Sequence, residues 1–131
     1  MRFTSSLILL GTFSAVRFAV ADFTYSNLVC DVEGGGFYNS SLIMPSKVST
    51  CNNAWDYSYN QTISNAEPNP TASICGGKVV IHKKSLTWSS GRDHGKCHKA
   101  GKKSKGKECN PKGVAICTWT EEIECSSKLC K

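Results

Sequence analysis

Apolar and polar residues alternate over several short segments of the chain, which is the pattern of half-buried β-strands. In the first segment, 23–33, Leu28, Cys30 and Val32 share one face of an extended chain. The other strand candidates are 37–44, 78–88 and 114–119, with glycine- or proline-rich turns between them. After residue 21 no segment of ten or more residues has helical periodicity. The pattern predicts an all-β sandwich or barrel of four to six short strands with long loops.

Residues 47–59 carry aromatic side chains at every second position, namely Trp55, Tyr57 and Tyr59. In an extended chain these rings share one face, which is either part of the core or a platform on which sugars stack. We expect the core face, because large aromatic side chains gain most from burial.

We expect residues 78–88 to pair with 114–120 as a hairpin. The 24-residue stretch 89–112 then forms a long connection between them, which in a compact domain is either functional or disordered. A Cys97–Cys109 disulfide is one pairing that would shorten this connection and hold its tip as a lobe.

Residues 1–21 have the layout of a secretory signal peptide. Arg2 gives a positive start, residues 7–16 are apolar, and residues 19–21 (Ala-Val-Ala) form a small-x-small cleavage site. The apolar run is shorter than the roughly 20 residues of a membrane helix. We therefore expect 22–131 to be a single secreted, extracellular, monomeric domain.

All eight cysteines follow the predicted cleavage site: Cys30, Cys51, Cys75, Cys97, Cys109, Cys117, Cys125 and Cys130. An even number in a secreted chain predicts four disulfides that staple the fold, each adding roughly 2–4 kcal/mol. Their spacing does not select a pairing. It contains no C-x-x-C motif, so we predict no metal site and no cofactor.

The most basic segment of the chain is 91–109, GRDHGKCHKAGKKSKGKEC. It supplies the candidate binding residues, which are Arg92, Lys96, Lys99, Lys102, Lys103, Lys105 and Lys107. Such a segment suits an anionic glycan, protein or membrane surface. It lacks aromatic side chains that stack on bases, so sequence-specific nucleic-acid binding is not expected. Alternatively, the segment is a solvated loop that only keeps the protein soluble, or its lysines fold against Glu121, Glu122 and Glu124.

The chain contains histidines and glutamates, the residue types that a ribonuclease uses as general acid and general base. His82 and either His94 or His98 are candidates, but their spacing matches no catalytic motif, and we expect no enzymatic activity. Because glycines surround His94 and His98, we do not expect a helix that presents both to a metal.

Two N-glycosylation sequons begin at Asn39 and Asn60. In a secreted chain both asparagines are expected to face solvent and to be available for glycosylation.

The leader MRFTSSLILLGTFSAVRFAVA, eight cysteines ending in CSSKLCK and the short β segments together resemble the small cysteine-rich secreted proteins of fungi, many of which are effectors in plant hosts. The resemblance covers the whole chain and concerns its general format. It implies a non-enzymatic, virulence-type protein that binds an extracellular, host or cell-wall partner. The alternatives are a cationic toxin acting on anionic membranes and a secreted ribonuclease.

Overall fold

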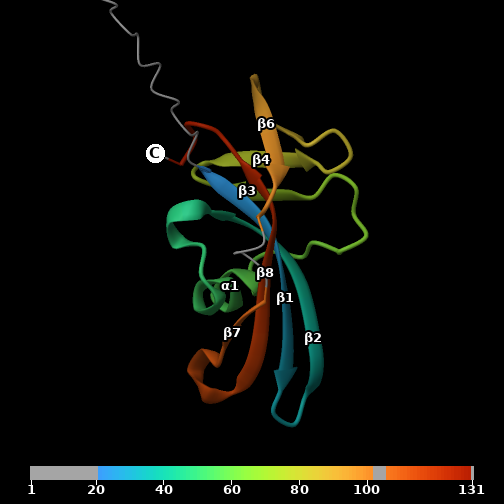
Figure 1. Cartoon of the computed structure of the whole chain (residues 1–131), viewed down its shortest axis with the longest axis vertical. Helices are drawn as coiled ribbons and strands as arrows, with labels where there is room; N and C mark the ends of the chain where they lie inside the picture. The colour runs from blue at the N-terminus through green and yellow to red at the C-terminus, as the bar shows by residue number, and fades with distance from the viewer. Residues whose placement is uncertain (1–20, 102–105, 131) are drawn as a thin grey trace, which may run out of the picture.

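The computed structural model describes residues 21–101 and 106–130 (Figure 1). The first strands, β1 (Phe23–Val32) and β2 (Gly36–Pro45), precede a short 3₁₀-helix, η1 (Ser46–Val48), and the α-helix α1 (Cys51–Ser58). The next strands are β3 (Thr71–Ile74), β4 (Gly77–His82), β5 (Thr87–Ser90), β6 (Asp93–Lys99) and β7 (Lys107–Cys109). A second 3₁₀-helix, η3 (Pro111–Gly113), then leads into the longest strand, β8 (Ala115–Cys125).

The strands form one antiparallel sheet in the order β2-β1-β8-β6-β5-β4-β3, with β7 also paired to β8. The ends of this order, β2 and β3, lie near each other, so the sheet nearly closes into a barrel. The predicted class, an all-β, disulfide-stapled sandwich or barrel, is confirmed, and of the two the sheet is barrel-like. The described residues contain eight strands, more than the four to six predicted. Segment 78–88 divides between β4 and β5, segment 91–109 contains β6 and β7 where a loop was expected, and β3 has no counterpart among the strand candidates.

A β-bulge in β8 gives the sheet two separate cores. Tyr25 pairs with Ile123, but the next residue of β1, Ser26, pairs with Glu121, so Glu122 is an extra residue. An extra residue reverses the face that the following side chains occupy. Trp119 and Ile123 therefore lie on opposite faces of the sheet, although residues four apart in a regular strand share one face.

The two cores define two halves of the molecule. In the barrel half, β3–β6 enclose the apolar side chains on one face of the sheet, including Phe23, Tyr25, Ile81, Trp88 and Ile123. In the helix half, α1 covers the opposite face, and its core includes Leu28, Leu42, Trp55, Cys117 and Trp119. Figure 1 shows β3, β4 and β6 at one end, α1, β7 and the β1–β2 hairpin at the other, and β8 running between them.

All eight cysteines form disulfides. Cys30–Cys117 and Cys97–Cys125 join directly paired residues of β8 with β1 and β6, with Cα atoms 4.0 Å apart in both. Cys51–Cys109 ties α1 to β7, and Cys75–Cys130 ties the β3–β4 turn to the C-terminal segment. Each half therefore contains one disulfide between strands and one that anchors a peripheral element.

The prediction that residues 47–59 are extended is wrong. The chain there forms α1, which Thr50 caps by accepting a hydrogen bond from the Asn53 amide at 3.2 Å. The buried residues of α1 are Cys51, Ala54, Trp55 and Ser58. This is helical spacing, so Trp55 is buried while Tyr59 is exposed, and the three rings do not share a face.

The predicted hairpin of 78–88 with 114–120 is also wrong. The polar residues 83–85 form a turn that divides the first segment into β4 and β5, which pair with each other. β8 pairs instead with β1, β6 and β7. The suggested Cys97–Cys109 disulfide is wrong as well, because the two cysteines bond to Cys125 and Cys51, respectively.

Candidate functional site

The basic segment 91–109 is not a long loop between two strands. Its first part forms β6, which pairs with the C-terminal end of β8, and its last part forms β7, which pairs with the other end of β8. The disulfides of Cys97 and Cys109 fix these parts in different halves of the molecule. β6 and β7 therefore present their charged side chains on a folded sheet.

Gly95 sets the position of β6 against the barrel core. A Cβ at this residue would lie 2.5 Å from Nε1 of Trp88, which is far too close. The indole Nε1 also donates a hydrogen bond to the Ser126 carbonyl oxygen at 2.9 Å, which fixes the ring. β6 thus passes directly over a buried tryptophan, with Gly95 and Cys97 turned towards the core.

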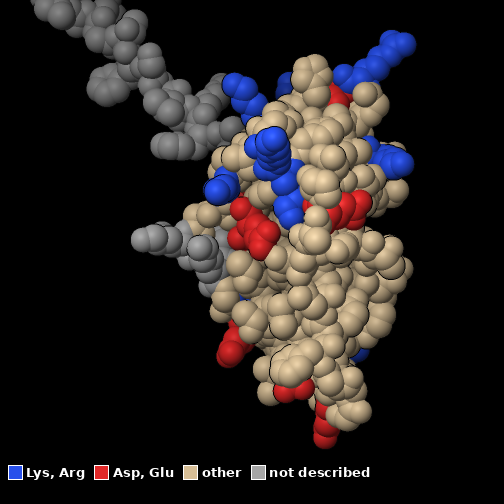
Figure 2. Space-filling view, turned by 90° about the vertical axis from the view of Figure 1, so that its right-hand side faces the viewer, with Lys and Arg blue, Asp and Glu red and all other residues tan. Residues whose placement is uncertain are grey.

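The alternate side chains of β6 form an outward row, His94, Lys96 and His98, which we name the basic face. All three are exposed. Residues two apart in a strand are roughly 7 Å apart, so the basic face carries evenly spaced hydrogen-bonding groups, with the positive charge of Lys96 between two imidazoles. Figure 2 shows Lys and Arg gathered over the barrel half, with acidic side chains in a central belt and at the opposite tip.

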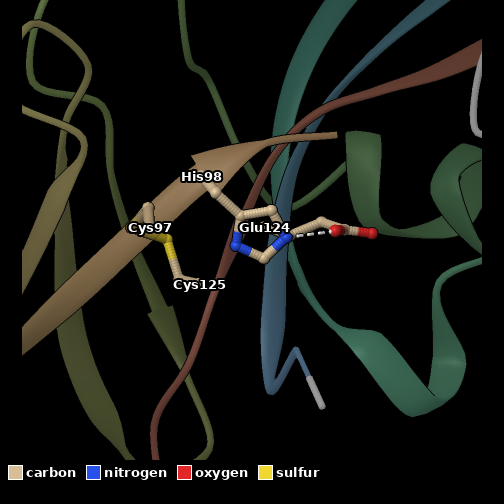
Figure 3. A network of polar contacts seen from close by, with 4 residues as sticks. All are labelled: Cys97, His98, Glu124 and Cys125. Atoms are coloured by element: carbon tan, nitrogen blue, oxygen red, sulfur yellow. Dashed lines mark hydrogen bonds and ion pairs between the residues drawn. A yellow bond between two sulfur atoms is a disulfide. The ribbon is translucent and has the colours of Figure 1, made fainter. Parts of the chain in front are cut away.

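His98 and Glu124 form the closest polar pair of the basic face. The distance from Nε2 of His98 to Oε2 of Glu124 is 2.7 Å, and the pair is an ion pair when the imidazole is protonated. The two residues are register partners directly beside the Cys97–Cys125 disulfide, which lies on the other side of the sheet (Figure 3). The imidazole is 56% exposed, so the pair is open to solvent and to a partner.

The structure brings together only part of the predicted binding residues. Arg92, Lys96 and Lys99 are exposed at or beside β6. Lys107 belongs to the helix half, where its Nζ lies 5.5 Å from the centroid of the Trp119 ring. Lys102, Lys103 and Lys105 lie outside the described residues.

The predicted contact between these lysines and the acidic residues of β8 does not occur within 21–101 and 106–130. Glu121 accepts a hydrogen bond from Ser49 Oγ at 3.0 Å, and Glu122 accepts one from the Asn27 side chain. Glu124 pairs with His98. The described cations of the segment therefore remain available to solvent.

A surface cavity of about 490 Å³ lies where β6 and β8 meet the β4–β5 turn. Lys83, Lys99, Glu121 and Glu122 are among its lining residues. The lining mixes both signs of charge, so this cavity is less suited to an anionic ligand than the basic face.

His82, a candidate acid or base, has partners for both ring nitrogens. Nδ1 lies 3.1 Å from Asn69 Oδ1, and Nε2 lies 3.0 Å from Ser89 Oγ. Both contacts hold the ring against the sheet, which favours a structural role over proton transfer.

Within the described part of the chain, no three His, Cys, Asp or Glu side chains are grouped closely enough to hold a metal ion. None of its helices is long and apolar enough to cross a bilayer. Both sequon asparagines, Asn39 and Asn60, are exposed.

Comparisons of the chain with protein-family models, with curated proteins and with solved structures find no match. The class of the protein follows from its own architecture, which over the described residues is a disulfide-stapled, nearly closed antiparallel β-barrel with one short α-helix.

Glu124 is the site residue that the sequence analysis did not place. The feature that could have placed Glu124 is the Cys97–Cys125 disulfide, because His98 follows Cys97 and Glu124 precedes Cys125. In antiparallel strands, a pair of facing cysteines makes these neighbours face each other on the opposite side. Without the disulfide pairing, the sequence could not reveal this contact.

Proposed function

We propose that the protein is a secreted, non-enzymatic effector or virulence-type protein that binds an extracellular or host partner through the basic face, flanked by Arg92 and Lys99. The observation that carries the proposal is the outward row of His94, Lys96 and His98 on a strand fixed by the Cys97–Cys125 disulfide. A rigid strand that presents polar and basic side chains at regular intervals is preorganised, so little entropy is lost when it binds.

The partner that this geometry fits best is an anionic glycan with regularly spaced sulfate or carboxylate groups. Lysine acts as a point charge and needs no fixed ligand geometry, which suits an extended and variable polymer. In the sequence, residues 102–105 follow β6 closely and add three lysines. The predicted leader, at residues 1–21, and the four disulfides favour an oxidising, extracellular setting for such an encounter.

Heparin, a sulfated glycan, is a practical probe for this proposal. Changing Arg92, Lys96 and Lys99 together to Gln should weaken binding tenfold or more, because a cation near an anionic surface contributes roughly 1 kcal/mol. The matched control changes Lys47, Lys107 and Lys112 to Gln, which removes the same charge outside the basic face. If both triple variants bind heparin equally well, the basic face is not the binding surface.

The membrane-toxin alternative is separated by a vesicle assay. Vesicles that contain phosphatidylserine should release a trapped dye in a salt-sensitive manner if the protein permeabilises anionic membranes. Our proposal expects no release at concentrations that saturate heparin.

The ribonuclease alternative gains one specific observation, the His98–Glu124 pair beside Lys96. A carboxylate can orient an imidazole for proton transfer, and a lysine can hold a phosphate. Our proposal expects no RNA cleavage above that of the His98→Ala variant. If the wild-type protein cleaves RNA and the His98→Ala variant does not, the protein is a ribonuclease and the binding proposal is wrong.

A further inference from the structure

Most of the exposed large apolar side chains gather at one end of the molecule. Phe37 is 85% exposed, Ile116 63% and Val29 42%, and Val114 lies at the same tip with 45% exposure. The strand register explains the grouping, because Phe37 pairs with Asp31 and Asp31 pairs with Ile116 across β2, β1 and β8. Phe37, Asp31 and Ile116 therefore form one row on one face of the sheet.

The next row of that face contains the first sequon. Val29 pairs with Asn39 on one side and with Thr118 on the other. We name these two rows the open face; its residues are Val29, Asp31, Phe37, Asn39, Ile116 and Thr118. Cross-strand neighbours such as Asn39 and Val29 have Cβ atoms about 5 Å apart, and Phe37 lies roughly 7 Å from Asn39 along β2.

The open face is the continuation of a buried surface. In the barrel half the same face of the sheet carries Tyr25, Ile43 and Ile123, which β3–β6 cover. The covered part of this face ends at Ser41, which is fully buried and forms hydrogen bonds with the side chains of Tyr25 and Asn65. Beyond this point, none of the described elements packs on the apolar side chains of the open face.

The side chain of Asn39 is held in a position that suits glycosylation. Its Oδ1 accepts a hydrogen bond from Asn65 Nδ2 at 2.9 Å. Its own Nδ2, the atom that carries an N-linked glycan, has no partner among the described residues. The Asn65 contact can therefore persist in the glycosylated protein and would fix the direction in which the glycan leaves the sheet.

We propose that Asn39 carries an N-linked glycan and that the first sugars of this glycan lie over the open face and shield it from water. In the transfer, Nδ2 bonds to the anomeric carbon of a polyisoprenyl diphosphate-linked oligosaccharide. The carbon–oxygen bond to the diphosphate breaks, and Nδ2 loses a proton. The inference rests on the proposed secretion, which supplies this donor, but not on glycan binding at the basic face.

The chemistry of the open face fits a sugar better than a second copy of the chain. A pyranose ring has an apolar face that can stack on Phe37 and hydroxyl groups that can donate to the carboxylate of Asp31. Glu108 pairs with Thr118 and adds another carboxylate at the edge of this face. In a two-fold dimer through the open face, these carboxylates would confront their own copies, which is unfavourable.

The test uses the full chain secreted from a eukaryotic host. Peptide mass mapping should find a glycan on Asn39. The Asn39→Asp variant keeps the oxygen that Asn65 contacts but accepts no glycan, and it should bind an apolar fluorescent dye severalfold more than wild type. Asn60→Asp is the matched control and should not. Adding Phe37→Ser to Asn39→Asp should return dye binding to the wild-type level.

A second measurement does not depend on refolding a variant. Amidase treatment of the folded glycoprotein removes the glycan and converts Asn39 to Asp, so the treated protein should show the same increase in dye binding. The inference is overturned if Asn39 is unmodified in the secreted chain, or if glycan removal leaves dye binding unchanged. It is also overturned if the glycosylated protein is a dimer that Phe37→Ser dissociates.

The outcome is separable from that of the proposed function. Heparin binding through the basic face should be the same for wild type and Asn39→Asp, so either result can fail alone. A chain that is not exported at all would overturn the proposed secretion and, with it, the glycan.

Discussion

The barrel half and the helix half share β1, β2 and β8, but they bury apolar side chains on opposite faces of the sheet and cover them with different elements. The barrel half wraps β3–β6 around one face and leaves a polar, basic exterior. The helix half covers the other face with α1, which has eight residues, and leaves an apolar face open. The bulge at Glu122 makes the difference possible, because it lets one strand bury its odd-numbered residues on both faces.

The two ends of the sheet are therefore suited to different roles. The basic face lies on a strand whose core contacts are complete, so its side chains are free to bind. The open face lies on strands whose own burial is incomplete, so it requires a cover. If the two halves are built in this way, variants of one half should leave the other half intact.

Trp55→Ala and Trp88→Ala remove a buried tryptophan from the helix half and from the barrel half, respectively. Each should lower the free energy of unfolding by about 3–5 kcal/mol. Hydrogen exchange should show where stability is lost: Trp55→Ala should increase exchange in α1 and β7, and Trp88→Ala in β4–β6. Uniform loss of protection in both variants would contradict the existence of two cores.

Replacing Cys51 and Cys109 by Ser removes the disulfide between α1 and β7. The loss should destabilise the protein by about 2–4 kcal/mol, which thermal or denaturant unfolding would measure. Heparin binding of the folded fraction should be retained, because the basic face belongs to the other half. The matched control, Cys97→Ser with Cys125→Ser, should instead weaken heparin binding.

Gly95→Ala places a methyl group against the indole of Trp88. Strand and ring must move apart, at a cost of about 1–3 kcal/mol. The expected result is a lower melting temperature together with weaker heparin binding, because β6 shifts. Gly101→Ala is the control, because a Cβ there meets no atom of the described residues within 4 Å; it should leave both properties near wild type.

Glu124→Gln removes the carboxylate that pairs with His98. The stability change should be no more than about 1 kcal/mol, because the pair is solvent-exposed. Heparin binding should rise slightly, since one negative charge leaves the edge of the basic face. A large loss of stability in denaturant unfolding would show that the pair holds β6 to β8, contrary to our account.

The sequence predicted the fold class, the first two strands and four disulfides because these follow from local patterns. Alternation identified β1, and an even number of cysteines after a predicted leader indicated the four disulfides. It did not predict α1, whose helical spacing spans too few residues to stand out from a run of alternating aromatics. It also missed the bulge at Glu122, because one extra residue has no signature apart from the partner strand.

The candidate site could be predicted in composition but not in arrangement. The lysines of 91–109 were recognisable as a local concentration of charge. Their division between β6 and β7 depends on the disulfide partners of Cys97 and Cys109. These partners are 28 and 58 residues away in the chain, respectively. The His98–Glu124 contact depends on the same pairing.

The most direct test of the division between the two faces is a titration of isotope-labelled protein with a short heparin oligosaccharide, followed residue by residue by NMR. Our account predicts that the largest shifts occur at Arg92, His94, Lys96, His98 and Lys99, and that Val29, Phe37 and Ile116 do not change. Shifts centred on the helix half, with β6 unchanged, would contradict it.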